Sequence, residues 1–180
     1  MRLVLLHGHG SGPQELDAVA EVLRSAGDEV ICPAGTVVLR DGSRAWFDDP
    51  FANPEGRSGR SAESALVELD EQVNLAGTVV CGFSQGGAMA VAAGFLRADL
   101  LGVVSVCGFL PEGINVTGSS SPMLLVAGDA DVVVDPFYSE SLARLSKKAG
   151  CDVSLSTVST GHQWTSEVSA VVTKWLSRLT

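Results

Sequence analysis

The stretch Val79-Val80-Cys81-Gly82-Phe83-Ser84-Gln85-Gly86-Gly87-Ala88 decides the fold expected for this chain. It is an apolar run that breaks into the pattern G-x-S-x-G and then continues as a helix of small residues. A serine on such a tight strand-to-helix turn is forced outward, with a strained backbone and an exposed hydroxyl. Gly82 and Gly86 remove the Cβ atoms that would collide across the turn. The motif predicts a nucleophile at Ser84, and the plainer interpretation is a β–α turn with an N-capping serine.

Strand and helix patterns alternate along the whole chain. Continuous apolar runs are typical of strands that are covered on both faces, and strands separated by helices indicate βαβ units. The sequence therefore predicts an α/β fold, a compact doubly wound sheet of about six mostly parallel strands with helices on both faces. The expected strands are 2–7, 29–32, 78–82, 101–107, 123–127 and 152–158, and the expected helices are 15–26, 61–74, 85–97, 137–149 and 165–179. A length of 180 residues predicts one domain over residues 1–180.

Residues 33–60 interrupt this alternation. They show neither a helical nor a strand period, and structureless connections of this length are unusual and often functional. The segment carries Trp46 and Phe47, so we expect it to form part of a substrate wall. Its four arginines are balanced by four acidic residues, which favours a solvated loop over an anion site.

Composition narrows the classes of function. The chain is 46% hydrophobic and 18% charged, which suits a globular protein and argues against disorder. A net charge of −9 disfavours nucleic-acid binding, because that requires a basic surface. No apolar run reaches about 18 residues, so no membrane span is predicted. The apolar N-terminal stretch leads into H-G-H-G at 7–10 rather than into a cleavage site, which predicts a first strand and not a signal peptide.

The four cysteines each lie in or beside a predicted strand, at positions 32, 81, 107 and 151. They form no C-x-x-C pair, and no histidine is clustered near them in the sequence. This spacing fits neither a zinc site nor a disulfide framework, and it predicts buried free thiols in a reducing cytoplasm. We expect no metal and no other cofactor, and the expected partner is a small molecule.

A serine nucleophile needs a base, and the base needs an acid that orients it. Sites in open parallel sheets form beyond the carboxyl ends of the strands. Hydrolases with a G-x-S-x-G turn carry serine, acid and histidine in that chain order, and His162 is the only histidine that follows Ser84. The candidate acids after the strand at 123–127 are Asp129, Asp131 and Asp135. If Asp129 holds its own turn, as aspartates often do, Asp131 is free to reach His162.

An oxyanion formed during acyl attack needs two preorganised N–H donors. One is the N–H of Gln85, the residue after the nucleophile. The other should come from the glycine-rich loop at 7–12, in which we expect His9 to contribute its main chain. The loop is otherwise a generic β–α turn, because its glycine spacing does not fit the dinucleotide pattern G-x-G-x-x-G.

Six blocks of sequence carry a resemblance to a known family. They are L-H-G-H-G at 6–10, A-W-F-D at 45–48, G-F-S-Q-G-G at 82–87, G-F-L-P at 108–111, G-D-A-D-V-V-V at 128–134 and G-H at 161–162. In kind and order they resemble the α/β-hydrolase superfamily, and within it the carboxylesterase, phospholipase and acyl-protein thioesterase group. The resemblance implies the α/β-hydrolase fold over nearly the whole chain, and it makes Asp131 the acid.

The resemblance implies a serine hydrolase that cleaves a carboxylic ester or thioester through an acyl-enzyme on Ser84. His162 would be its base, and Asp131 would orient His162. The apolar substrate wall is expected to contain Trp46, Phe47, Phe109 and Leu110. Two alternatives stay open: acyl transfer or C–C hydrolysis on the same three side chains, and a non-catalytic binding module that keeps the fold.

The chain departs from the family pattern in three places. It is shorter than usual, and the segment between Asp48 and the helix at 61–74 is trimmed. That segment helps form the acyl-binding lid of thioesterases, so long-chain acyl substrates are not expected. Cys107 stands where a serine is usual, and Asp135 stands where a proline is usual.

Overall fold

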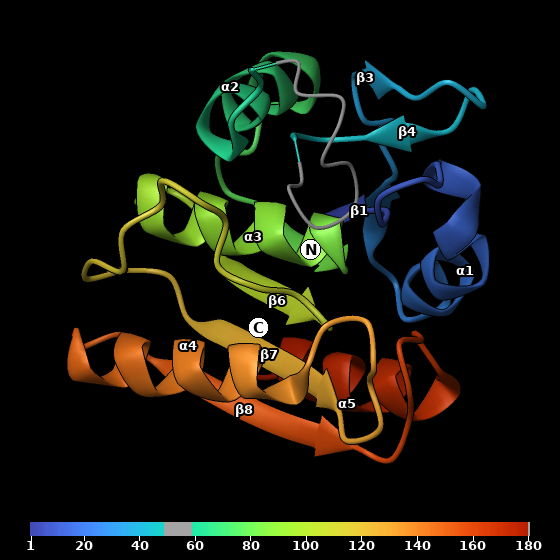
Figure 1. The fold of residues 1–180 in the computed structure, drawn as a ribbon. Coiled ribbons are helices and arrows are strands. Elements are labelled where there is room, and N and C mark those ends of the chain that lie inside the picture. Colours follow the sequence, from blue (N-terminus) through green and yellow to red (C-terminus); the bar gives the residue numbers. More distant parts are fainter. Residues whose placement is uncertain (49–58, 180) are drawn as a thin grey trace.

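Six parallel strands form the central sheet of the computed structural model, which describes residues 1–48 and 59–179 (Figure 1). The strands are β1 (Arg2–Leu6), β2 (Glu29–Ile31), β5 (Val79–Phe83), β6 (Gly102–Val106), β7 (Met123–Gly128) and β8 (Val153–Val158). Their order is β2-β1-β5-β6-β7-β8, and each neighbouring pair is parallel. We call the edge where these strands begin the amino edge and the edge where they end the carboxyl edge.

Alternate strand residues supply two separate cores, one on each face of the sheet. Leu3 and Leu5 pack on one face and Val4 and Leu6 on the other, and all four are buried. This follows from the two-residue period of a strand, whose successive side chains point to opposite faces. Because both faces are covered, the strands read as continuous apolar runs in the sequence.

Helices cover both faces, as the sequence predicts. They are the short 3₁₀ helix η1 (Pro13–Leu16) and the α-helices α1 (Asp17–Ser25), α2 (Ala62–Val73), α3 (Gln85–Leu96), α4 (Pro136–Lys148) and α5 (Ser166–Leu176). Residues of α2, α3 and α4 join the core on one face, and residues of α1 and α5 join the core on the other. Helix α3 lies against β5 and β6 and is covered by α2, so it is buried along nearly its whole length. The predicted fold class is therefore confirmed.

The segment at 33–60 is not without strands, which corrects the expectation from its sequence. β3 (Val37–Val38) and β4 (Arg44–Ala45) pair antiparallel, and Gly42 adopts a left-handed φ of 85° in the turn between them. Strands of two residues are too short to show a period, which is why the sequence does not reveal them. The carbonyl oxygen of Arg44 accepts hydrogen bonds from the N–H groups of Gly10 and Ser11, so the hairpin is held against the loop after β1. Residues 49–58 of the predicted loop lie outside the described residues.

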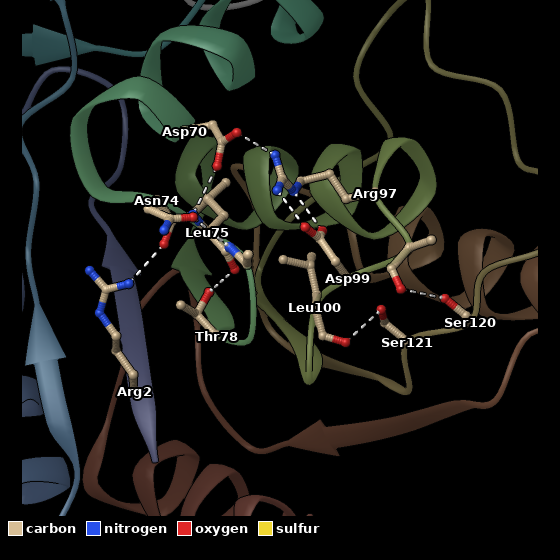
Figure 2. A network of polar contacts seen from close by, with 12 residues as sticks. Arg2, Asp70, Asn74, Leu75, Thr78, Arg97, Asp99, Leu100, Ser120 and Ser121 are labelled. Atoms are coloured by element: carbon tan, nitrogen blue, oxygen red, sulfur yellow. Dashed lines mark hydrogen bonds and ion pairs between the residues drawn. The ribbon is translucent and has the colours of Figure 1, made fainter.

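A polar network joins the elements that meet at the amino edge (Figure 2). Arg97, just after α3, pairs with Asp70 of α2 and with Asp99. Asp70 also accepts a hydrogen bond from the N–H of Leu75, and the carbonyl oxygen of Leu75 accepts one from the hydroxyl of Thr78. Backbone groups just past the end of α2 that would otherwise be unpaired are thereby satisfied.

Within residues 1–48 and 59–179, no helix has the length and apolar character needed to cross a membrane.

Candidate active site

The order of the strands reverses at β1. From β1 the chain goes to β2 on one side, and it later returns to β5 on the other side of β1. In open parallel sheets, ligands bind at such a reversal of strand order, outside the carboxyl ends of the strands. Ser84 follows β5 directly, and His9 lies in the loop that follows β1. The loops after β7 and β8, which carry Asp131 and His162, reach the same edge.

Ser84 lies on a strained turn between β5 and α3. Its backbone has φ 54° and ψ −117°, in a region that side chains other than glycine rarely adopt. A Cβ on Gly82 would lie 2.0 Å from the carbonyl oxygen of Gly86, and one on Gly86 would lie 2.2 Å from the carbonyl oxygen of Leu6. The prediction that glycine is needed at both positions is therefore confirmed. Ser84 is partly exposed, whereas the residues on either side of it are buried.

The structure brings three side chains that are far apart in the sequence into one hydrogen-bonded chain. Nε2 of His162 lies 2.9 Å from Oγ of Ser84, and Nδ1 of His162 lies 2.7 Å from Oδ2 of Asp131. An ionised carboxylate only accepts hydrogen bonds, so Nδ1 carries the proton when it bonds to Asp131. Nε2 of the neutral ring is then free to accept the hydroxyl proton of Ser84.

Asp131 is buried but well supplied with donors. Its Oδ1 accepts hydrogen bonds from the N–H groups of Val133 and Val134, each at 2.9 Å, while Oδ2 faces His162. Burial by itself raises the pKa of Asp131, but the bonds from His162 and from the two backbone N–H groups outweigh it. The pKa of this carboxyl is therefore below its ordinary value, and the group stays negatively charged.

The other two candidate acids bond to groups other than His162. Oδ2 of Asp129 accepts a hydrogen bond from the hydroxyl of Ser159, and among the described residues its carboxylate does not make the expected bond to its own turn. Asp135 caps α4, where its Oδ1 accepts from the N–H of Phe137. Neither carboxylate is bonded to His162 among the described residues.

The loop that carries His162 is held from two sides. The ring of Phe83 packs against the imidazole with 4.9 Å between ring centroids. The N–H of Ala130 donates to the carbonyl oxygen of Thr160, which joins the loop after β7 to the loop after β8. These loops approach so closely that a Cβ on Gly128 would lie 2.5 Å from that same carbonyl oxygen. The imidazole is thus fixed by its surroundings and not only by its two hydrogen bonds.

The two main-chain N–H groups that the sequence predicts as oxyanion donors have no acceptor within the described part of the chain. They belong to Gln85, the first residue of α3, and to His9. The N–H groups on either side of His9 are occupied, because Gly8 donates to Glu15 and Gly10 donates to Arg44. The first N–H groups of a helix have no partner inside the helix, and they favour negative charge. Both groups are therefore available to an anionic oxygen.

The side chain of Gln85 ties the turn after β5 to the segment after β4. Its Oε1 accepts from the N–H of Trp46, and its Nε2 donates to the carbonyl oxygen of Phe47, both at 2.8 Å. The side chain of Trp46 is buried, with 1% of the residue exposed, and its indole N–H donates to the carbonyl oxygen of His7. Trp46 therefore supports the loop after β1 and offers no surface to a ligand in this structure.

A pocket of about 570 Å³ lies beside this segment. Phe47, Phe109 and Leu110 line it, together with Arg60, which pairs with Glu68. The rings of Phe47 and Phe109 meet edge to face, with 6.4 Å between their centroids. Three of the four residues expected on the apolar wall are thus brought together, and Trp46 is not among the described residues that line the pocket.

Cys107 lies next to Asp131 and His162 in space, although no histidine is near it in the sequence. One ligand atom from each of these three residues lies within 4.8 Å of the others, so the group could hold a metal ion. Burial, followed by the charge of Asp131 and hydrogen bonding to it, raises the pKa of the Cys107 thiol to about 12. Metal ligation needs the thiolate, so this proton and the bond between His162 and Asp131 both oppose it. All four cysteines are free thiols, and three of them are buried as predicted, whereas Cys32 is half-buried.

Sequence reasoning missed three residues that shape the site. Glu15 holds Gly8, as described above. His7 is fully buried; its Nε2 accepts from the N–H of Gly35 at 2.9 Å, and burial lowers its pKa, so its ring is held neutral. Cys107 is the third. Its position directly after β6 was the signal available, because every strand that ends at the carboxyl edge can deliver a residue to the site.

The arrangement can perform nucleophilic chemistry on a carbonyl group. A hydroxyl, a base and an acid are aligned, and unpaired N–H donors lie at the same edge. A family model described as phospholipase/carboxylesterase matches residues 2–180. The comparison with curated proteins found no match.

Solved structures of esterases and a thioesterase resemble the chain over nearly its full length. The carboxylesterase of Bacillus cereus is 23% identical with a TM-score of 0.82, and the match covers 99% of this chain and 88% of that one. Esterase PE8 is 26% identical with a TM-score of 0.80, covering 99% and 92%. Acyl-protein thioesterase 2 of Zea mays is 23% identical with a TM-score of 0.75, covering 99% and 93%. The fold of the chain is the one that these enzymes share.

Proposed function

The chain belongs to the phospholipase/carboxylesterase family of α/β-hydrolases, and from that premise we propose that it is a serine hydrolase acting on a carboxylic ester or thioester of a small molecule. The observation that carries the proposal is the hydrogen-bonded chain from Ser84 through His162 to Asp131. Its geometry supports acyl transfer to Ser84, followed by hydrolysis of the acyl-enzyme.

Acylation begins with proton transfer from Ser84. Nε2 of His162 takes the hydroxyl proton while Oγ attacks the carbonyl carbon, and His162 then gives the proton to the leaving alcohol or thiol. Asp131 holds the imidazole in the required tautomer and stabilises the imidazolium that forms. Its depressed pKa supports this role, because the carboxylate must stay charged throughout.

The negative charge on the carbonyl oxygen is received by the main-chain N–H groups of His9 and Gln85. Both lack a protein acceptor in the described structure, so an oxyanion would displace no hydrogen bond within the protein. Loss of one such donor typically costs about 3–4 kcal/mol of transition-state stabilisation. A water molecule, deprotonated by His162, then attacks the acyl-enzyme and releases the acid.

The substrate is expected to carry a short apolar acyl group. The pocket of about 570 Å³ is within the range of small-molecule sites, and Phe47, Phe109 and Leu110 give it an apolar wall. Trp46 would act indirectly, by holding the loop that presents His9. The free cysteines support a reducing compartment, and we propose the cytoplasm as the place of action.

Hydrolysis of short p-nitrophenyl esters and of matched thioesters tests this proposal. Ser84→Ala should lower kcat/KM by about 10⁴-fold or more, because the nucleophile is removed while the fold is kept. Ser120→Ala is the control, since among the described residues its hydroxyl bonds only the carbonyl oxygen of Ala98, at the amino edge. Equal turnover by wild type and Ser84→Ala would exclude Ser84 as the nucleophile. Added alcohol would reveal acyl transfer as an ester product in place of the acid.

A further inference from the structure

The peptide unit between Gly8 and His9 carries one of the two N–H groups that are proposed to receive the oxyanion. No cis peptide bond occurs among the described residues, so the N–H of His9 points opposite to the carbonyl oxygen of Gly8. A Cβ on Gly8 would lie 3.5 Å from Cβ of Ser84, so this peptide unit lies beside the nucleophile. The groups that hold Gly8 therefore decide where the N–H of His9 points.

The ring of His7 holds the carbonyl oxygen of Gly8. Nε2 of His7 lies 2.9 Å from the backbone nitrogen of Gly35, and because a backbone N–H only donates, Nε2 is the unprotonated nitrogen of the ring. The proton of the neutral ring is then on Nδ1, which donates to the carbonyl oxygen of Gly8 at 2.7 Å. The ring is fully buried and packs against that of Trp46, with 4.9 Å between centroids. The carbonyl end of Gly8 is thus fixed by a well-packed donor.

The carboxylate of Glu15 holds the other end of Gly8. Its Oε2 accepts from the N–H of Gly8 at 2.7 Å, a short distance that is typical of a charge-assisted hydrogen bond. Glu15 is an exposed residue of η1, whereas Gly8 is buried, so loss of the carboxylate would leave a buried N–H without its acceptor. With its carbonyl oxygen on His7 and its N–H on Glu15, Gly8 cannot rotate without breaking one of the two bonds.

The charge of Glu15 and its hydrogen bond should affect the proposed reaction in opposite directions. A Cβ on Gly8 would lie 3.3 Å from Oε2 of Glu15 and 3.5 Å from Cβ of Ser84, so the carboxylate lies close to the nucleophile. Its negative charge would repel an oxyanion that forms there. Its hydrogen bond, by contrast, holds the donor that receives the oxyanion. A neutral acceptor of the same length separates the two effects.

We propose that Glu15 is a positioning residue for the proposed reaction. Acting opposite the ring of His7, its carboxylate fixes Gly8 so that the N–H of His9 faces the oxyanion. The inference rests on the proposed function, which assigns that role to the N–H of His9. Glu15 acts through the backbone of Gly8, and the oxyanion exists only in and near the transition state. Its effect therefore belongs in kcat and not in KM.

Three substitutions separate the hydrogen bond from the charge and from the length of the side chain. Glu15→Gln keeps an acceptor without the charge, Glu15→Met keeps the length without an oxygen, and Glu15→Ala removes both. Glu21→Ala is the matched control, because Glu21 is an exposed acidic residue of α1 whose side chain has no hydrogen bond or ion pair among the described residues. Each variant is checked for folding by its thermal transition.

Two measurements are made on the full chain: kcat and KM for a short ester, and the inhibition constant of a short trifluoromethyl ketone, whose adduct with Ser84 would carry an oxyanion. We expect Glu15→Met and Glu15→Ala to lower kcat about five- to twentyfold, which is less than the loss of a whole donor, and to leave KM within about twofold. The ketone should bind more weakly by a similar factor. Glu15→Gln should match or exceed the wild type in both measurements, and Glu21→Ala should change neither.

The outcomes distinguish this inference from the proposed function. If the wild type shows no turnover that depends on Ser84, the proposed function fails, and the role of Glu15 fails with it. If the wild type is active but Glu15→Met and Glu15→Ala match it in kcat and in ketone binding, only the positioning role is wrong. That role is also overturned if Glu15→Gln behaves like Glu15→Ala, because the charge then matters and not the hydrogen bond. If Glu15→Ala does not fold, Glu15→Met decides; if neither folds, the role is structural and the inference is wrong.

Discussion

Polar side chains cluster at both the carboxyl edge and the amino edge of the sheet, but the two clusters differ in their exposure to water. At the carboxyl edge, the carboxylate of Asp131 is 1% exposed and the imidazole of His162 is 18% exposed. At the amino edge, the side chains of Asp70 and Asp99 are 34% and 49% exposed around Arg97 (Figure 2). The first cluster is shielded from water and therefore depends on complete pairing, whereas the second is solvated and tolerates loss of a partner.

Backbone strain follows the same division. Ser84 and Cys107 adopt left-handed φ angles at the carboxyl edge without the side-chain types that tolerate them. The only comparable residue near the amino edge, among those described, is Asn74, which ends α2 with φ 50°. Asparagine is common at such helix ends, so its conformation needs no special support. Among the described residues, left-handed backbone outside glycine is therefore found beside the hydrogen-bonded chain of Ser84, His162 and Asp131, and at the amino edge it is found where a helix ends.

The largest expected difference between the edges is in catalysis. His162→Ala should lower kcat/KM by ~10⁴–10⁶-fold, because the base is removed while the surrounding loops remain. The matched change at the amino edge, Arg97→Ala, should leave kcat/KM within about twofold, since its contacts reach no residue of the site. Steady-state kinetics on the same short ester compares the two. A large loss of activity in Arg97→Ala would break the division between the edges.

A backbone collision should be the largest expected effect on stability. Gly86→Ala brings a Cβ to 2.2 Å from the carbonyl oxygen of Leu6, and we expect it to cost at least about 3 kcal/mol or to prevent folding. Gly118→Ala, on the loop that leads to the amino edge, meets only the carbonyl oxygen of Ala149 at 3.7 Å. It should change the free energy of unfolding by less than about 0.5 kcal/mol. Urea unfolding measures both, and similar losses would mean that the carboxyl edge is not packed more tightly.

The stability contributed by the buried His7, at the carboxyl edge, should depend on pH. Burial lowers the pKa of His7 below its unfolded value near 6.5, so the folded state binds fewer protons than the unfolded state. The contribution of His7 to stability is present above about pH 6.5 and is lost as the pH falls toward the lowered folded pKa. His7→Gln keeps an acceptor for the N–H of Gly35 but cannot take up a proton.

The stability of wild type relative to His7→Gln should therefore fall between pH 7.5 and pH 5.5. Urea unfolding at these two pH values gives the difference directly, because the other titrating groups are common to both proteins. A difference that stays constant would show that the ring of His7 is not held neutral by its burial.

The smallest effect is expected from the exposed ion pairs. Arg97→Ala removes a two-pronged pair with Asp99 and a contact with Asp70, and it should lower the melting temperature by a few degrees. Because the pairs are solvated, added salt should shrink the difference from wild type. Differential scanning calorimetry at low and high salt makes the comparison. A difference that salt leaves unchanged would mean that the amino edge is more shielded than its exposure suggests.

Much of the fold follows from the sequence because its signals are long and local. The apolar runs at β1, β5 and β7 and the small-residue helix α3 lie within one or two residues of their predicted bounds. The hairpin of β3 and β4 was missed, because two-residue strands carry no period and depend on contacts with the loop after β1. The local sequence pattern therefore predicts the strands of the central sheet and the helices that cover it. The pairing of two-residue strands depends on tertiary contacts and cannot be predicted in this way.

The site divides in the same way. The chain order of serine, acid and histidine leads to Ser84, Asp131 and His162, which the structure brings within hydrogen-bonding distance. Cys107 carries no motif of its own, because its contacts are with residues 24 and 55 positions later in the chain. The burial of Trp46 could not be predicted from the sequence either. An aromatic residue in a loop is expected to be able to contact a ligand, and only the structure shows that its indole N–H donates to the carbonyl oxygen of His7.

The central claim is that Ser84 is an activated nucleophile, and covalent labelling tests it most directly. The folded protein is treated with a fluorophosphonate probe, and the adduct is located by peptide mass mapping. We predict a single adduct on Ser84 that His162→Ala abolishes, because the hydroxyl is unreactive without its base. A folded protein that takes no label, or one labelled on another residue while Ser84 stays unmodified, would contradict the account.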